Sequence, residues 1–245
     1  MPTLYLIGIG LSEGDITQKA ADAIKKCDIV YAEDYTNKFI GDIGSIENAA
    51  GKKITKISRE DVESSFLLDE TKSKNVALLV AGDPLIATTH FELVLEAKKR
   101  GIDAEIVHAP SVYSAISAAG LHIYKFGRAT TLASWRASSP YDAAAENKKR
   151  GLHTLILLDT KEGDYMALKE ALDILRALED QKKEKIFTPE AMLLACSCLG
   201  SGKQRIIYAG MKDLAKTALE PPITLVLPGD THFKEEEALA LWKKG

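Results

Sequence analysis

The apolar run Val76-Ala77-Leu78-Leu79-Val80 constrains the fold more than any other segment of the chain. It contains no polar residue, so a strand formed by it would have no face suited to water. Strands that are apolar on both faces are typical of parallel sheets that helices cover on both sides. The run therefore predicts a central strand in a layered α/β structure.

Strand-like and helix-like patterns alternate on both sides of this run. Short apolar strands are expected at residues 4–7, 28–32, 53–57 and 104–108. Alternation of strands and helices is typical of an α/β domain with a mostly parallel sheet. We therefore expect residues 1–120 to form an N-terminal α/β domain of this type.

The second half of the chain has a different order of elements. Strands are expected at residues 130–133, 153–158, 192–198, 205–209 and 223–227. The turn-like sequence Gly200-Ser201-Gly202-Lys203 separates the third of these strands from the fourth, which indicates an antiparallel hairpin. Helices are expected from Leu168 onward and over residues 234–244. Residues 121–245 are therefore predicted to form a C-terminal α/β domain with a mixed sheet.

Composition excludes several classes of protein. The chain has 32 Lys and Arg against 35 Asp and Glu, so it lacks the basic excess of a generic nucleic-acid binder. No apolar stretch approaches the ~18 residues of a membrane span, and the N-terminus has no signal-peptide pattern. Three cysteines, an odd number, favour a reducing compartment. We expect a soluble cytoplasmic protein that binds neither nucleic acid directly nor a membrane.

The sequence predicts neither a metal site nor an activated nucleophile. The five histidines have no paired spacing such as His-Glu-x-x-His, and Cys196-Ser197-Cys198 lacks a second ligand pair. No Gly-x-Ser-x-Gly elbow and no Walker lysine loop occurs. The motifs therefore identify no catalytic residue.

Three loops that follow strands of the first domain favour a ligand site. They contain Gly8-Ile9-Gly10, Gly82-Asp83-Pro84 and His108-Ala109-Pro110-Ser111. Because ligands of open α/β sheets bind at the carboxyl ends of the strands, these loops are expected to border one crevice. Asp83 could accept hydrogen bonds from a ligand or form only a local turn, and Ser111 could be only a helix cap.

Gly8 and Gly10, together with Glu33-Asp34 after the second strand, resemble part of a dinucleotide-binding fingerprint. Glu13 stands where the third glycine is needed, and a helix capped by Asp15 would begin too late. Both acids would also repel a phosphate. The pattern favours a structural turn, or a nucleoside ligand without phosphates, over NAD or FAD.

Six segments of the chain resemble the diphthine synthases, which are cousins of the tetrapyrrole methylases. They are residues 4–11, 58–63, 81–90, 108–111, 120–127 and 151–155. The block Gly120-Leu121-His122-Ile123-Tyr124-Lys125-Phe126-Gly127 separates this family from its cousins. The resemblance implies two α/β domains of the tetrapyrrole methylase type, a cofactor cleft between them, and a homodimer.

The resemblance also implies an activity. Diphthine synthases use S-adenosylmethionine to methylate the amino group of a modified histidine, the diphthamide precursor, on translation elongation factor 2. The implied cofactor contacts are Leu11, Asp83, Ile86, Ser111, Val112, Leu158, Leu199 and Ile223. Because the sulfonium is already an activated leaving group, such an enzyme mainly has to align the reactants and exclude water.

The sequence departs from the family's pattern at two places, and other functions stay open. Residues 133–141 form a shorter loop than the family has, and Ile223 follows Pro221-Pro222 where a histidine is common. A tetrapyrrole (precorrin-type) methyltransferase and a non-catalytic nucleoside-binding module are the alternatives. In the 120–127 block, Lys125 could attract a carboxylate-bearing acceptor, or the block could be only a strap between the domains.

Overall fold

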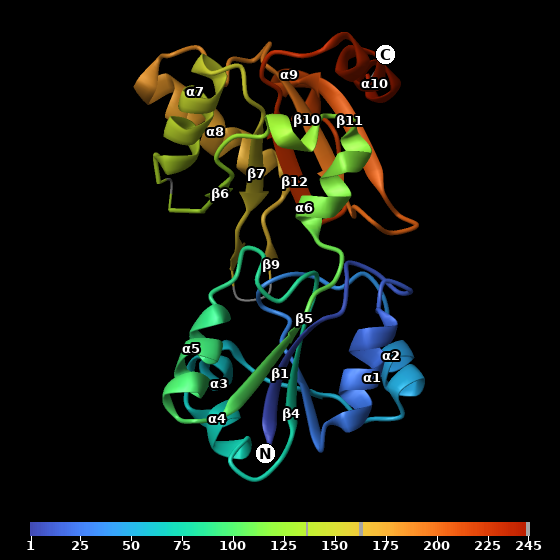
Figure 1. Ribbon diagram of the computed structural model, residues 1–245. Coiled ribbons are helices and arrows are strands. Elements are labelled where there is room, and N and C mark those ends of the chain that lie inside the picture. The colour runs from blue at the N-terminus through green and yellow to red at the C-terminus, as the bar shows by residue number, and fades with distance from the viewer. Residues whose placement is uncertain (136, 162–163, 244–245) are drawn as a thin grey trace. The chain divides into compact units, whose positions relative to one another are not determined.

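The computed structural model describes residues 1–135, 137–161 and 164–243 (Figure 1). The chain forms two compact units, Met1–Ala115 and Ile116–Gly245. The division precedes the predicted boundary after residue 120. The reason is that the short 3-10 helix η1 (Ile116–Ala119) packs against strand β10 (Met192–Ser197) of the second unit.

The first unit contains a five-stranded sheet in which all neighbouring strands are parallel. Its order is β3-β2-β4-β1-β5. The strands are β1 (Thr3–Gly8), β2 (Ile29–Ala32), β3 (Thr55–Lys56), β4 (Val76–Val80) and β5 (Asp103–Val107). All five residues of β4 are buried at the centre of the sheet. The predicted central strand and the mostly parallel N-terminal sheet are thus confirmed.

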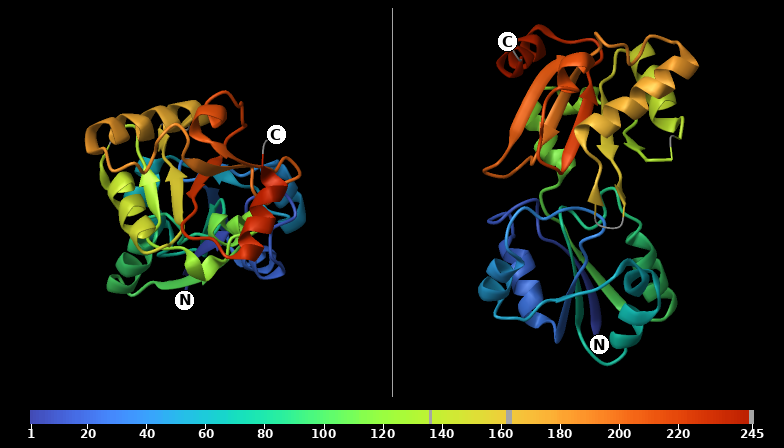
Figure 2. Two further views of the ribbon diagram at one scale, coloured as in Figure 1. Left: turned by 90° about the horizontal axis from the view of Figure 1, so that it is seen from above. Right: turned by 180° about the vertical axis from the view of Figure 1, so that it is seen from behind.

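Helices cover both faces of this sheet, as Figures 1 and 2 show. On one face lie α1 (Gln18–Lys26) and α2 (Ile43–Ala50), and on the other lie α3 (Arg59–Glu63), α4 (Phe66–Glu70) and α5 (Phe91–Lys99). Successive residues of β4 alternate between the two cores: Leu79 packs with the α1 side and Leu78 with the α4 side. The short helix α6 (Val112–Ala115) ends the unit.

The second unit contains a mixed five-stranded sheet of order β11-β10-β12-β7-β6. Besides β10, the strands are β6 (Thr130–Leu132), β7 (Thr154–Leu158), β11 (Arg205–Gly210) and β12 (Ile223–Leu227). Only β6 and β7 pair in parallel, and the β10–β11 hairpin is antiparallel. The predicted hairpin and mixed sheet are confirmed. A small ribbon of β8 (Thr160–Lys161) and β9 (Asp164–Tyr165) follows β7.

Five helical segments complete the second unit. They are η2 (Ile123–Lys125), α7 (Ser139–Lys149), α8 (Leu168–Lys182), α9 (Met211–Leu214) and α10 (Phe233–Trp242). Helix α8 buries Leu168, Leu172 and Leu175 in the core of the second unit, as the amphipathic pattern predicted. Two positions of predicted segments, Arg136 in the 133–141 loop and Lys244 in the last helix, lie outside the described residues. Within those residues, no helix is both long and apolar enough to cross a membrane.

Candidate functional site

The three strand-end loops of the first unit meet at the carboxyl edge of its sheet. The amide of Gly82 donates to the carbonyl of Gly10 at 2.7 Å, and these two residues form an isolated β-bridge. A Cβ atom placed on Gly82 would lie 3.8 Å from the side chains of both Leu11 and Ser111. Leu11, Gly82 and Ser111, which follow β1, β4 and β5, are therefore close neighbours, as the sheet argument predicted.

Gly8 allows this close approach. A Cβ atom at Gly8 would lie 2.6 Å from the carbonyl oxygen of Gly82, 2.8 Å from Ala109 Cβ and 2.9 Å from Pro84 Cδ. Real Cβ atoms are not found that near to other heavy atoms, so any larger residue would force the three loops apart. Gly8, the first glycine of the Gly8-Ile9-Gly10 loop, is thus needed for packing whether or not a ligand is bound.

Asp83 joins the second loop to the third. Its side chain is buried, and Oδ1 accepts a hydrogen bond from the amide of Leu85 at 3.0 Å. Oδ2 accepts from the amide of Ala109 at 3.3 Å and lies 2.7 Å from Nδ1 of His108, 25 residues away. Asp83 therefore forms the local turn that the sequence suggested and also a bridge between two strand ends, which no motif indicated.

The prediction that Asp15 caps the first helix is wrong. Helix α1 begins at Gln18, and Thr17 is its N-cap, since Thr17 Oγ1 accepts from the amide of Ala20 at 3.0 Å. Asp15 Oδ2 instead accepts from the amides of Leu11 at 2.9 Å and Ser12 at 3.0 Å. Backbone amides of a glycine loop are the groups that bind phosphate in nucleotide sites. Here a carboxylate of the chain itself holds them, which supports a ligand without phosphates.

Glu33 is a buried acid at the same edge of the sheet. Its amide donates to Leu79 O at 3.2 Å, and its Oε2 accepts from the amides of Tyr35 and Thr36 at 3.0 and 2.9 Å. No described residue forms a hydrogen bond with Glu33 Oε1. Burial raises the pKa of this carboxyl, which lowers the cost of leaving an oxygen unpaired. The acid after the second strand was visible in the sequence, but its burial was not.

His90 holds the loop that carries Asp83 and Ile86. Its Nδ1 lies 3.2 Å from the carbonyl of Pro84, and its Nε2 lies 3.3 Å from the hydroxyl of Tyr35. Burial lowers the pKa of His90, which favours the neutral ring. A carbonyl only accepts, so the proton belongs on Nδ1, and Nε2 accepts from Tyr35. The loop conformation is thus held by the buried His90 and its half-buried partner Tyr35.

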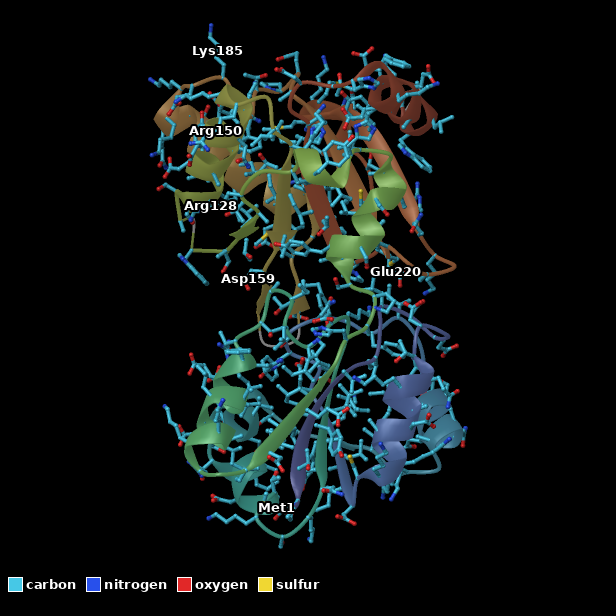
Figure 3. All side chains as sticks on the ribbon, viewed as in Figure 1. Met1, Arg128, Arg150, Asp159, Lys185 and Glu220 are labelled. Carbon is cyan, nitrogen blue, oxygen red and sulfur yellow. The ribbon has the colours of Figure 1, made fainter. Side chains whose placement is uncertain are left out.

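The predicted contacts of the second unit gather at one end of its sheet. Ile223 begins β12 opposite Ser197 of β10, Thr224 pairs with Leu157, and the amide of Cys198 donates to Pro222 O at 3.0 Å. Leu158, Leu199 and Ile223 therefore lie near one another. Figure 3 labels Asp159, which follows Leu158, and Glu220, which lies three residues before Ile223. Both labelled residues lie at the same end of the sheet. That one cofactor contacts these residues and those of the first unit stays a prediction.

A buried carboxylate fixes the 120–127 block within the second unit. Glu235 Oε1 accepts from the amide of His122 at 2.8 Å and from His153 Nε2 at 2.9 Å. Glu235 Oε2 accepts from Lys125 Nζ at 2.5 Å and from the amide of His232 at 2.8 Å. Burial alone would raise the pKa of Glu235, but these donors outweigh it and hold the pKa well below its usual range.

The cluster also determines which ring nitrogen of His153 carries the proton. This side chain has no exposed surface. Its Nδ1 accepts from the amide of Gly229 at 2.9 Å, so the proton is on Nε2 and points to Glu235. Burial lowers the pKa of His153, in agreement with a neutral ring. Lys125 donates to Glu235 and to Asp230 O, so its ammonium is already paired within the second unit, which does not favour recruitment of an acceptor. The described residues contain no group of three or more His, Cys, Asp or Glu that could hold a metal ion.

Comparisons with known proteins also relate the chain to the diphthine synthases, over nearly its full length. A family model described as Tetrapyrrole (Corrin/Porphyrin) Methylases matches residues 3–214. The diphthine synthase of Methanocaldococcus jannaschii is 41% identical over 249 residues, which cover 96% of this chain and 97% of the relative. The diphthine synthase of Methanococcus maripaludis strain C6 is 39% identical over 247 residues, with the same coverage. A crystal structure of diphthine synthase matches with a TM-score of 0.90 and 32% identity, covering 98% of this chain and 96% of that one.

Proposed function

The chain belongs to the diphthine synthases of the tetrapyrrole methylase family, and from this premise we propose its donor and its acceptor. The enzyme is a methyltransferase of diphthamide biosynthesis. The proposed donor is S-adenosylmethionine, and the proposed acceptor is the amino group of the modified histidine on translation elongation factor 2. The observation that carries the proposal is the identity of 41% to a diphthine synthase over 96% of the chain.

The strand-end loops of the first unit suit the nucleoside part of this donor. Asp15 occupies the amides of Leu11 and Ser12, so the site favours a ligand that brings no phosphate. Gly82 leaves room beside its loop, because a Cβ atom there would have no heavy atom nearer than 3.5 Å. Apolar side chains at Leu11 and Val112 suit an adenine ring. The proposed contacts in this unit are Leu11, Asp83, Ile86, Ser111 and Val112.

The second unit contributes the other proposed contacts, which are Leu158, Leu199 and Ile223. Leu199 and Ile223 are buried apolar residues beside the backbone of the Cys198–Pro222 pairing. An apolar side chain at position 223 changes little if the ligand is bound there through main-chain groups, because the backbone of a strand end offers the same donors and acceptors for any residue. The missing histidine after Pro222 is therefore compatible with donor binding.

The methyl group arrives on a sulfonium, which is an activated leaving group. The task of the chain is then to hold the acceptor nitrogen in line with the methyl carbon and to keep water away from it. Alignment of this kind contributes up to ~7–11 kcal/mol to lowering a barrier. The three glycine-dependent loops and the His90–Tyr35 pair that fixes one of them supply rigidity suited to this task.

A tetrapyrrole methyltransferase is the second candidate, because the family model covers both groups. A macrocycle with many carboxylates would need several arginines or lysines at the site. Lys125 is bound to Glu235, so it is not free to pair with such carboxylates. The identity of 41% to a diphthine synthase over 96% of the chain favours a protein acceptor over a tetrapyrrole.

Transfer of a labelled methyl group tests the proposal. The protein is incubated with labelled S-adenosylmethionine and one of three acceptors: elongation factor 2 bearing the unmethylated precursor, elongation factor 2 lacking the modification, or a precorrin-type tetrapyrrole. We expect label only in the elongation factor 2 that bears the unmethylated precursor. Label in the tetrapyrrole, or in no acceptor although the donor binds, would contradict the proposed function.

A further inference from the structure

His108 is an exposed imidazole attached to a buried carboxylate. It follows β5 and begins the loop that leads to Ser111, one of the proposed donor contacts. Its Nδ1 lies 2.7 Å from Asp83 Oδ2, and the exposed fraction of its side chain is 68%, against 8% for Asp83. Because Asp83 also accepts from two backbone amides, it is held in place and fixes one edge of the ring.

This contact sets the position of the proton on His108. An ionised carboxylate only accepts hydrogen bonds, so Nδ1 must carry the hydrogen that it donates to Asp83. Nε2 is then left with its lone pair. No described residue forms a hydrogen bond with Nε2, and the ring is largely exposed, so this lone pair is accessible at the edge of the donor-binding loops.

Amine methylation requires a group that takes up a proton. An amine with a positive charge has no lone pair to donate, so one N–H bond must break before each attack on the methyl carbon. The proton has to leave the nitrogen, and imidazole is the side chain best suited to exchange protons near neutral pH. The motifs named no such residue.

We propose that His108 is a catalytic residue that accepts this proton through Nε2, and that Asp83 is the positioning residue that orients its ring. The inference rests on the proposed methylation of an amino group. It adds a specific proton acceptor to a reaction that was otherwise described only by alignment of reactants.

The acceptor N–H bond breaks, its electron pair stays on nitrogen, and the proton moves to His108 Nε2, which forms an imidazolium. The nitrogen lone pair forms the N–C bond to the methyl group while the C–S bond breaks and its electrons return to sulfur. The Asp83 carboxylate stabilises the imidazolium through Nδ1–H, as the aspartate does in hydrolase triads. The imidazolium then gives its proton to water, so each methyl transferred releases one proton.

The alternative is that His108 only ties two loops together, and His108→Asn separates the two roles. The asparagine side-chain amide can donate to Asp83 in place of Nδ1, which keeps the tie, but it cannot take up a proton. We expect kcat to fall by about 10²–10⁴-fold. The dissociation constant of S-adenosylmethionine and the melting temperature should stay near the wild-type values.

A second variant gives a readout that a structural role would not produce. In His108→Ala the ring is missing, and added imidazole can enter the space and accept the proton, so activity should rise with imidazole concentration. His232→Asn serves as the matched control, because His232 is an exposed N-cap whose acceptor role asparagine can fill. We expect this control to keep the wild-type kcat.

The outcomes distinguish this inference from the proposed function. If the wild-type enzyme methylates elongation factor 2 and His108→Asn does so at an unchanged kcat, His108 is not the proton acceptor and the inference is overturned. A loss of donor binding in His108→Asn together with no imidazole rescue of His108→Ala would assign the residue a structural role and overturn it as well. If the wild-type enzyme itself transfers no methyl group, the proposed function fails first.

Discussion

At the scale of single residues, the buried charges of this protein are paired across long stretches of sequence. Glu235 accepts from His122, 113 positions away, and from His153, 82 positions away. A buried carboxylate is costly unless its oxygens are hydrogen-bonded, and here four donors satisfy it. The cluster connects α10, the 120–127 block and the segment before β7, so it stabilises the second unit.

Glu235→Gln should lower the free energy of unfolding at pH 7 by about 3 kcal/mol, because it leaves the Lys125 ammonium without its counter-charge. The pKa of Glu235 is depressed in the folded state, so its contribution is present above the unfolded-state pKa of about 4.3 and is lost as the pH falls below that value. The difference between wild type and variant should therefore be constant from about pH 5 to pH 7 and shrink toward pH 3.

Denaturant unfolding at a series of pH values measures this difference. Glu237→Gln is the matched control, because Glu237 is exposed on the same helix and, among the described residues, forms an ion pair with Lys234 alone. Exposed pairs of this kind contribute about 0–1 kcal/mol. The role assigned to the cluster would be contradicted if Glu235→Gln lowered the free energy of unfolding no more than Glu237→Gln does. A loss for Glu235→Gln that grows as the pH falls would contradict it as well.

At the scale of elements, the site of the first unit depends on how closely three strand ends approach one another. The strands themselves follow from local patterns, which is why β4, the β10–β11 hairpin and the two sheet types could be predicted from the sequence. The position of the loops depends on contacts between them, such as that of Gly8 with Gly82 and Ala109.

Gly8→Ala should weaken the binding of S-adenosylmethionine by at least about tenfold and destabilise the protein by about 1–3 kcal/mol, the typical cost of overpacking. The added methyl group would collide with backbone and side-chain atoms of two neighbouring loops. Gly202→Ala is the control, because a Cβ atom there has no neighbour within 4 Å. Calorimetric titration and a thermal melt of both variants give the result, and equal affinities would contradict the close packing of the loops.

The sequence predicted that the three loops meet, but it did not predict which side chains pair across them. The Asp83–His108 pair joins residues that belong to two separate motifs, and nothing in either motif specifies the other. The error at Asp15 has a similar cause: a capping pattern describes only local spacing, whereas the carboxylate satisfies amides of the preceding loop. Glu33 was recognised as an acid after a strand, but its burial depends on the folded chain around it and not on local spacing.

At the scale of the whole molecule, the homodimer stays a prediction. Sedimentation velocity at micromolar concentration should give a species with the mass of two chains of 26.7 kDa each. Dilution should not shift the sedimentation coefficient if the interface has the size typical of a stable dimer, about 1,200–2,000 Å² of buried surface. A single species with the mass of one chain would contradict the expectation.

The measurement that tests the central claim most directly is the mass of the histidine-containing peptide of elongation factor 2. The factor, bearing the unmethylated precursor, is incubated with the protein and S-adenosylmethionine, digested, and analysed by tandem mass spectrometry. We expect the modified histidine to gain the mass of one or more methyl groups on its amino nitrogen, and no gain when the donor is omitted. An unchanged mass of that peptide, with the donor bound and the enzyme folded, would contradict the account.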